Sequence, residues 1–388
     1  MNPGSSGESP NYRCGCAPES SNIAVKAMGA PSRKTSMDVK QEVLDIPRAL
    51  RETLGKGRPE YEALVRKTHW GDGPIYVVGN GPSFIAGLAA AYSIEALLGW
   101  PVVVRPTSVF KAYSLAALRP RSILLVISPS GEGEETLETV QAARSRGATL
   151  LTVTHNSTSP LAQAADGVFL VRPGEESQWG VKQAILDQTV VAFISLVAAR
   201  VLRRHHPQLD VLEQEFEKLP GSVEWVLTQM SDAALSLAEG LAGAGGFSIV
   251  GAGFYHPTVL QAALEVERLA GLRSEGLEVS EFSQGAKRAS RQEEPVVFVS
   301  GSRCRLKKKV HQAAAQARTA GAKIFSLTDA EDRELAERSL IALLVPPLTE
   351  MTGSIVTHVL LAWMGYQLGY RQRHESKAVE RKDDAKQP

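Results

Sequence analysis

Short apolar runs alternate along the chain with longer segments whose hydrophobic positions recur at helical spacing. The run Ile123–Val126 is continuously apolar and predicts a buried strand. From there the pattern predicts a helix at 134–145, a strand at 149–154, a helix at 160–165, a strand at 167–171 and a long helix at 183–202. Apolar strands that alternate with helices indicate parallel sheets covered by helices on both faces.

The pattern occurs twice. Residues 75–110 align with residues 247–282 at a constant offset of 172, without a gap. Each copy reads as a strand, a Gly-rich turn, a helix and a second strand, so we infer a duplicated domain. The predicted fold class is α/β, with two duplicated doubly wound parallel-sheet domains. Identical residues in the first copy are Val78, Gly79, Gly81, Ala90, Ala91, Glu95, Leu97, Gly99, Ser108 and Phe110, which recur as Val250, Gly251, Gly253, Ala262, Ala263, Glu267, Leu269, Gly271, Ser280 and Phe282.

Length and composition agree with two domains of an ordinary soluble protein. The chain has 388 residues, 43% hydrophobic and 22% charged, and a formal net charge of +1. This balance gives no electrostatic argument for nucleic acid or an acidic membrane surface as a partner. No apolar run is long enough to span a membrane, and three scattered cysteines form no disulfide framework, so we expect a cytoplasmic protein.

The two ends of the chain differ in composition from the rest. Residues 1–36 are rich in Gly, Ser and Pro, and we expect them to be disordered, with Met37 as an alternative start to Met1. Cys14-Gly-Cys16 in this leader is a poor metal site on its own. The expected boundaries are a leader at 1–36, a first domain at 37–210, a second domain at 211–372 and a tail at 373–388.

Generic nucleotide-binding signatures are weak here. The first turn reads Gly79-Asn-Gly81-Pro-Ser83 and lacks the third glycine of G-x-G-x-x-G, and no G-x-x-x-x-G-K-[ST] sequence occurs. The sequence has no metal-ligand spacing either. We therefore expect neither a metal nor a cofactor.

Small hydroxyl residues follow two of the predicted strands, in Gly79–Ser83 and in Ser128-Pro-Ser130-Gly-Glu132. Ligands of doubly wound sheets sit beyond the carboxyl ends of the strands. Hydroxyls and backbone N–H groups at a helix amino end suit a phosphate, and neither loop contains Lys or Arg, so the cradle would be neutral. The alternative is that these serines only cap helices.

These motifs resemble the tandem sugar isomerase (SIS) domain family, and specifically the isomerase half of glucosamine-6-phosphate synthases. The resemblance covers about residues 38 to 380 and implies flavodoxin-like three-layer α/β/α domains. It rests on the two serine loops, on Ser159-Pro-Leu-Ala162, on the opening segment Glu42–Pro47 and on the tail Arg373–Val379.

The resemblance implies a phosphosugar site in the first domain, formed by Ser83, Ser128 and Ser130 with backbone from Pro129 and Gly131. Two residues depart from the family pattern. Pro129 stands where the family has Gln and has no N–H to donate, and Gly133 replaces a Thr hydroxyl. Because the second copy, at Val299–Arg303, lacks the loop, we expect one phosphosugar site per chain.

The catalytic residues that the resemblance implies are only partly present. Lys377 matches the family's imine-forming lysine, and Glu281 matches the glutamate of its Gly-Glu-Leu-Lys-His motif. The ring-opening histidine is replaced by Gln284, whose amide does not titrate, and the glutamate base by Arg268, which stays protonated. His256 is a low-ranking substitute. Arg268 could instead bind a carboxylate or a second phosphate, or pair with Glu265, Glu278 or Glu281.

The expected ligand is a phosphosugar or a phosphorylated sugar–amino acid conjugate. The first hypothesis is an aminosugar-phosphate isomerase, deaminase or deglycase that uses Lys377, with a homodimer implied by the resemblance. The alternatives are a catalytically reduced sensor of a phosphosugar and a structural paralogue that only forms dimers. Since 36 residues precede the expected fold, amination from glutamine would need ammonia or a separate partner.

Overall fold

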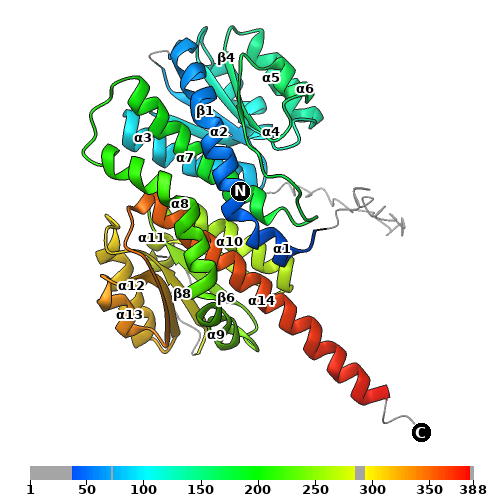
Figure 1. Ribbon diagram of the computed structural model, residues 1–388, viewed down its shortest axis with the longest axis vertical. Helices are drawn as coiled ribbons and strands as arrows, with labels where there is room; N and C mark the ends of the chain where they lie inside the picture. The colour runs from blue at the N-terminus through cyan, green and yellow to red at the C-terminus, as the bar shows by residue number, and fades with distance from the viewer. Residues whose placement is uncertain (1–36, 71–72, 285–292, 385–388) are drawn as a thin grey trace, which may run out of the picture. The chain divides into compact units, whose positions relative to one another are not determined.

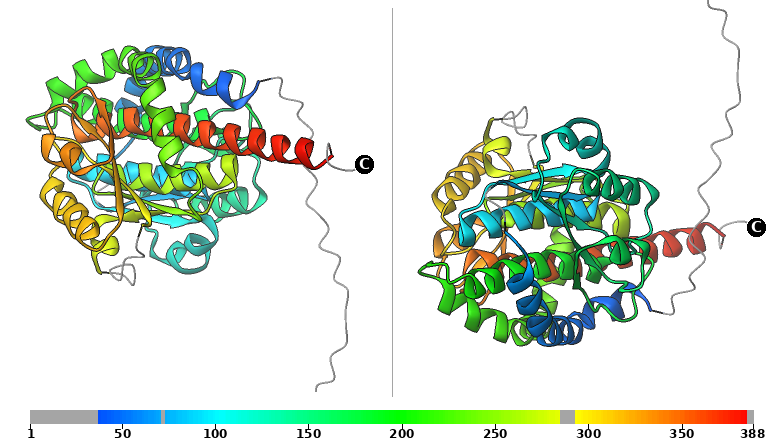
Figure 2. Two further views of the ribbon diagram at one scale, coloured as in Figure 1. Left: turned by 90° about the horizontal axis from the view of Figure 1, so that it is seen from below. Right: turned by 90° about the horizontal axis from the view of Figure 1, so that it is seen from above.

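The structure is a computed structural model that describes residues 37–70, 73–284 and 293–384, with side chains described up to residue 373. The expected disordered leader, with Met1, Cys14 and Cys16, lies outside the described residues. Two five-stranded sheets, both entirely parallel, form the framework, and helices flank each of them (Figures 1 and 2). The predicted fold class of two duplicated α/β domains is confirmed.

The two sheets share one strand order. The first sheet runs β2-β1-β3-β4-β5 and the second runs β7-β6-β8-β9-β10. In both, the first strand of the copy lies between the second and the third, so the chain reverses its direction of winding beside the first strand. The strands are β1 Ile75–Gly79, β2 Val102–Pro106, β3 Ile123–Ile127, β4 Thr149–Thr154, β5 Gly167–Leu170, β6 Phe247–Gly251, β7 Ser274–Glu278, β8 Pro295–Val299, β9 Lys323–Asp329 and β10 Ile341–Val345.

The helices agree with the sequence pattern to within two residues at the ends that were predicted for the first domain. Short π and 3₁₀ turns at Phe110–Ser114 and Leu115–Ala117 follow α4. The helices are α1 Val39–Leu44, α2 Ile46–Lys67, α3 Pro82–Leu98, α4 Thr107–Val109, α5 Glu134–Arg144, α6 Pro160–Ala164, α7 Val181–Val201, α8 Leu209–Gln229, α9 Ser231–Leu241, α10 Tyr255–Ala270, α11 Val279–Gln284, α12 Lys307–Thr319, α13 Arg333–Arg338 and α14 Glu350–Asp384.

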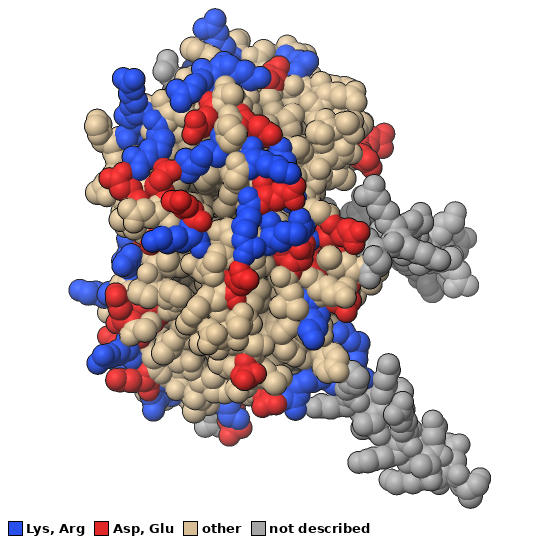
Figure 3. All heavy atoms as spheres, viewed as in Figure 1, with Lys and Arg blue, Asp and Glu red and all other residues tan. Residues whose placement is uncertain are grey.

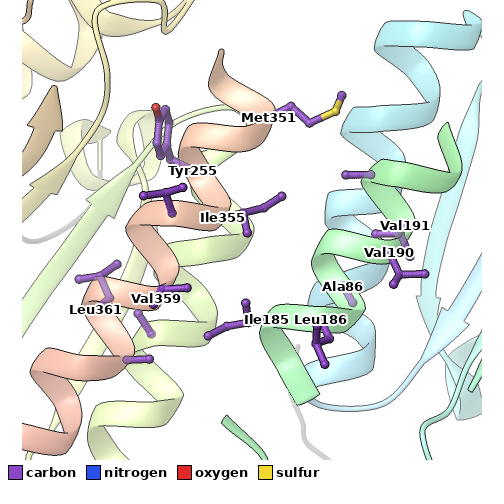
Figure 4. Close-up of a cluster of buried hydrophobic side chains, with 14 of the residues drawn as sticks. Ala86, Ile185, Leu186, Val190, Val191, Tyr255, Met351, Ile355, Val359 and Leu361 are labelled. Carbon is purple, nitrogen blue, oxygen red and sulfur yellow. The ribbon is translucent and has the colours of Figure 1, made fainter. Parts of the chain in front are cut away.

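The main core is built around apolar helices. Side chains of α7 and α14 belong to this one cluster, and Ile185 of α7 projects toward Ile355 and Val359 of α14 (Figure 4). By length and composition α7 could cross a membrane, but 89% of its apolar window is buried inside the protein, so it serves as a core helix. Its apolar character on all sides follows from that burial.

The repeated glycines have a physical reason. A Cβ on Gly79 would lie 2.8 Å from the backbone of Ser83, and one on Gly251 would lie 3.0 Å from the Tyr255 carbonyl. The first glycine of each turn therefore lets the helix approach the strand end. The second, Gly81 or Gly253, has a positive φ of 53° or 58°, which glycine adopts without strain.

Candidate functional site

The two serine loops meet at one edge of the first sheet. Ser83 lies in the first turn of α3, directly beyond β1, and Ser128 follows the end of β3. Because β1 and β3 are neighbours and β2 lies on the other side of β1, both loops flank the topological switch point. Ser83 is buried, Ser128 is half-buried and Ser130 is exposed. The site residues predicted for the phosphate thus occupy the place where such sheets bind ligands.

The loop that carries Ser128 and Ser130 is fixed by the next strand. The Ser128 N–H donates to the Val153 carbonyl at 3.0 Å, and the Pro129 carbonyl accepts from the His155 N–H at 2.9 Å. Pro129 therefore contributes a carbonyl that holds the loop in place, while its missing N–H is no loss to that role. Gly131 turns the chain with φ of 65°, and its carbonyl accepts from the Leu161 N–H at 3.1 Å.

The hydroxyls of this loop are available. Among the described residues, neither Ser83 nor Ser128 makes a side-chain hydrogen bond within the chain, so neither caps a helix. Ser130 Oγ accepts a long bond of 3.4 Å from the Glu132 N–H. No side chain caps α5 at its Gly133 end, although Glu134 and Glu135 in the first turn would repel an anion there. The Ser130 bond lies within its own turn, before α5 begins, so the helix-cap alternative accounts for none of the three serines.

The second copy supplies an internal comparison. At the offset of 172, Ser128 and Ser130 correspond to Ser300 and Ser302. Ser302 donates to Oδ2 of Asp329 through its backbone N–H at 2.6 Å and through its hydroxyl at 2.9 Å. The second serine loop therefore binds a carboxylate of its own chain, which shows that this loop geometry suits an anion. In the first copy, His155 directly follows β4 and occupies the position that Asp329, the last residue of β9, has in the second copy.

Arg268, at the family's base position, makes a different contact from those expected. Its guanidinium donates to the Trp179 carbonyl at 2.6 Å, which joins α10 to the loop between β5 and α7. The alternative of a pair with Glu265 is wrong, because the buried Glu265 instead pairs with His358 at 3.2 Å. Among the described residues, no ion pair links Arg268 to Glu278 or Glu281 either.

Glu267 and its repeat counterpart Glu95 have one structural role. The Glu95 carboxylate accepts from the N–H of Val102, the first residue of β2, at 3.1 Å. The Glu267 carboxylate accepts from the N–H of Ser274, the first residue of β7, at 3.4 Å. In each copy this glutamate ties the end of a helix to the start of the next strand, so Glu267 is not a displaced base.

The other predicted catalytic residues lie far from the serine loops along the sequence. His256 is the second residue of α10, and burial lowers the pKa of its imidazole although Glu278 and Glu281 act in the opposite direction. His256 and Glu281 therefore lie within electrostatic range of each other. Gln284 is the last residue of α11. Lys377 lies in the last part of α14, and its side chain lies outside the described residues.

Sequence reasoning missed a buried charged cluster at the same sheet edge. His155 directly follows β4, and its Nε2 lies 2.9 Å from Oδ1 of Asp187 on α7. Its Nδ1 lies 3.6 Å from Oε1 of Glu176, in the loop after β5. The rule that polar residues at the carboxyl ends of parallel strands mark a site could have found His155. Asp187 gave no such signal, since it lies within an apolar helix.

Comparison with known proteins agrees with this geometry. The SIS domain model matches residues 71–202 and 241–366, which is more than half of the chain. The chain is 27% identical over 311 residues to the glutamine–fructose-6-phosphate aminotransferase of Synechocystis and 27% over 330 residues to that of Thermococcus kodakarensis. These alignments cover 77% and 84% of the chain, but 48% and 54% of the relatives. The chain thus spans about half the length of these relatives.

Solved structures show the same fold. The C-terminal domain of glucosamine-fructose-6-phosphate aminotransferase from Francisella tularensis superposes with a TM-score of 0.77 at 21% identity, covering 88% of this chain and 98% of that one. Glucosamine-6-phosphate deaminase from Thermotoga maritima superposes with a TM-score of 0.65 at 17% identity, covering 85% and 95%. With two matched domains, two sheets of one strand order and serine loops at the switch point, the chain belongs to the SIS domain family.

Proposed function

We propose that this protein binds a phosphosugar at Ser83, Ser128 and Ser130, with the backbone of Gly131 and the free amino end of α5. The observation that carries the proposal is the position, at the switch point of the first sheet, of the Ser83 and Ser128 hydroxyls, which make no hydrogen bond to any described residue. Asp329 in the second copy supports it, because the N–H and hydroxyl of Ser302, the counterpart of Ser130, hold an anion there. Since Asp329 fills the second loop, one phosphosugar site per chain follows.

For the reaction, we propose carbonyl–amine chemistry on an aminosugar phosphate or a sugar–amino acid conjugate. Lys377 would form an imine with the open sugar, and Glu281 would carry a proton, with His256 beside it. The names of the relatives, an aminotransferase acting with fructose 6-phosphate and a glucosamine-6-phosphate deaminase, support this substrate class.

We also propose a cytoplasmic homodimer. Basic and acidic side chains are interspersed over the face shown in Figure 3, without a large patch of one sign.

A specific observation favours a second candidate, a phosphosugar sensor without catalysis. Arg268 stands at the base position and is engaged by the Trp179 carbonyl, so it holds a loop in place. Gln284 at the ring-opening position has an amide that transfers no proton at neutral pH. A protein that keeps the phosphate loop and loses both groups would bind the sugar and release it unchanged.

A thermal-shift screen with trapping separates these candidates. The purified protein is heated with fructose 6-phosphate, glucosamine 6-phosphate and phosphorylated sugar–amino acid conjugates, with and without borohydride, and then analysed by mass spectrometry. A ligand at 100 times its Kd should stabilise the fold by about 2.7 kcal/mol. Stabilisation with a borohydride adduct on Lys377 indicates the enzyme, and stabilisation without an adduct indicates the sensor.

Matched variants locate the binding site. Ser83→Ala and Ser130→Ala should lose most of the ligand-induced shift. Ser145→Ala is the control, because Ser145 lies at the other end of α5 and its hydroxyl bonds only the Ala142 carbonyl, at 2.8 Å. If no phosphosugar shifts the melting temperature of the wild-type protein, the proposed function is wrong and the structural paralogue is the better explanation.

A further inference from the structure

Because Arg268 stands at the family's base position and stays protonated, the residue at that position cannot take a proton from the sugar carbon. Arg268, at that position, holds the Trp179 carbonyl. The loop at 171–180 therefore lies against α10, where the family places its base. This loop contains Glu176, three residues before Trp179, and the Glu176 side chain is 25% exposed. The loop that Arg268 holds therefore contains a carboxylate with an exposed side.

The loop around Glu176 is held from its other side as well. The Ser177 hydroxyl donates to the buried carboxylate of Glu42, and the Lys182 N–H donates to the same carboxylate at 3.1 Å. The Lys182 ammonium donates to the Glu175 carbonyl at 2.6 Å. Glu175 and Ser177, the two neighbours of Glu176, are therefore both fixed. A side chain between two anchored residues is restricted in position, as an acid/base group must be.

Two further titratable residues follow from Glu176 toward the core: His155 lies next to Glu176, and Asp187 lies next to His155. His155 Nδ1 lies 3.6 Å from Glu176 Oε1, and among the described residues neither of these buried atoms has a hydrogen-bond partner. His155 Nε2 lies 2.9 Å from Asp187, whose side chain is 1% exposed. The three residues form a line from the core to the exposed side of Glu176. In many acid/base and nucleophilic sites, a second group orients the base and a third group orients the second.

The electrostatics of the line support a role in proton transfer. Burial alone would lower the pKa of His155, but the Asp187 carboxylate outweighs it and raises that pKa to about 9. The imidazole is therefore protonated at neutral pH and can orient the Glu176 carboxylate. The line also adjoins the serine loop, since the His155 N–H donates to the Pro129 carbonyl at 2.9 Å.

We propose that Glu176 is the acid/base group of this protein, with His155 and Asp187 as its positioning residues. The inference rests on the proposed phosphosugar site. The Glu176 carboxylate takes the proton from the carbon beside the sugar carbonyl. The C–H electron pair becomes the C=C bond of an enediol, and the carbonyl π pair moves to the oxygen, which takes a proton from water. Glu176 then returns its proton to the former carbonyl carbon. The hydroxyl on the carbon that first lost its proton gives its O–H proton to water, and the new carbonyl forms at that carbon.

The test is exchange of the sugar's carbon-bound proton with deuterium, followed by NMR in D₂O with fructose 6-phosphate and glucosamine 6-phosphate. Wild-type protein should catalyse exchange into at least one of them. Glu176→Gln should reduce the rate about 100-fold or more and leave the ligand-induced thermal shift unchanged. The neighbouring Glu175→Gln is the control, because Glu175 is exposed and the contact made at this residue uses its backbone carbonyl.

A pH profile separates positioning from mere support of the fold. Asp187→Asn should move the alkaline limb of the exchange rate to lower pH, because His155 loses the carboxylate that keeps it protonated. An unchanged limb, or Glu176→Gln exchange within threefold of wild type, overturns the inference. Wild-type protein that binds a phosphosugar and exchanges no proton also overturns it, while the phosphosugar site stands. If no phosphosugar binds, both proposals fall.

Discussion

Replacing Gly131 with alanine is the sharpest perturbation of the serine loop. Gly131 has φ of 65°, a left-handed conformation that costs a residue with a Cβ about 1–2 kcal/mol. A Cβ there would also lie 2.2 Å from the Ser159 hydroxyl. Ser159 caps α6 by accepting from the Ala162 N–H at 3.2 Å. Displacing it forfeits a cap of about 1 kcal/mol, so Gly131→Ala should cost roughly 2–3 kcal/mol in total.

Thermal denaturation with and without ligand measures both consequences. Since a domain of 150–250 residues loses about 2–4 °C per kcal/mol, the melting temperature of the first domain should fall by roughly 4–12 °C. The phosphosugar-induced shift should largely disappear, because the loop cannot keep Ser128 and Ser130 in place.

Gly133→Ala is the matched control for this variant. Gly133 has an ordinary φ of −62°, and the nearest atom to its Cβ would be Thr136 Oγ1 at 3.3 Å. This variant should stay within about 1 kcal/mol of wild type. If Gly131→Ala kept both the stability and the ligand response of Gly133→Ala, the account of a preorganised loop would be refuted.

Three further predictions concern other parts of the molecule. Glu95→Gln and Glu267→Gln should each lower the free energy of unfolding in chemical denaturation by at most about 1 kcal/mol, because each weakens one equivalent helix-to-strand hydrogen bond. Neither variant should change ligand binding. A selective loss of binding in Glu267→Gln would contradict the structural role. The raised pKa of His155 contributes stability that is complete below its ordinary pKa of 6.5 and is lost as pH rises through about 9. The denaturation midpoint should therefore fall over that interval in wild type and fall less in His155→Gln. Equal falls in the two proteins would be inconsistent with this assignment. Asp329→Ala leaves the Ser302 N–H without its acceptor and its hydroxyl with only the 3.4 Å bond to Glu331, and should destabilise the second domain by about 1–3 kcal/mol. In a thermal scan with added phosphate, this variant should regain more stability than wild type gains, and no difference would argue against an anion-binding loop.

Much of the fold followed from the sequence, because its determinants are local or periodic. The alternation of apolar strands and helices predicted the first domain's elements to within two residues. The repeat at an offset of 172 predicted that Glu95 and Glu267 would do the same thing, and the structure gives them the same bond. The two glycines of each turn were visible because close approach and positive φ exclude other residues.

The side-chain contacts of the site could not be predicted in the same way. Nothing in the sequence indicates that Arg268 would hold a carbonyl in the other copy's loop, since that contact joins residues 89 positions apart. The acidic residues near Arg268 suggested an ion pair, but Glu265 points into the core and meets His358, 93 positions away. Likewise, the role of Asp187 is visible only in the structure, where α7 packs against β4 and the Asp187 carboxylate contacts His155.

The most direct test of the central claim is a structure determined with a bound phosphosugar. The account predicts that the phosphate lies within hydrogen-bonding distance of the Ser83, Ser128 and Ser130 hydroxyls and at the amino end of α5, and that the second serine loop keeps Asp329. A phosphate bound away from these three serines, at the second copy or elsewhere, would contradict it.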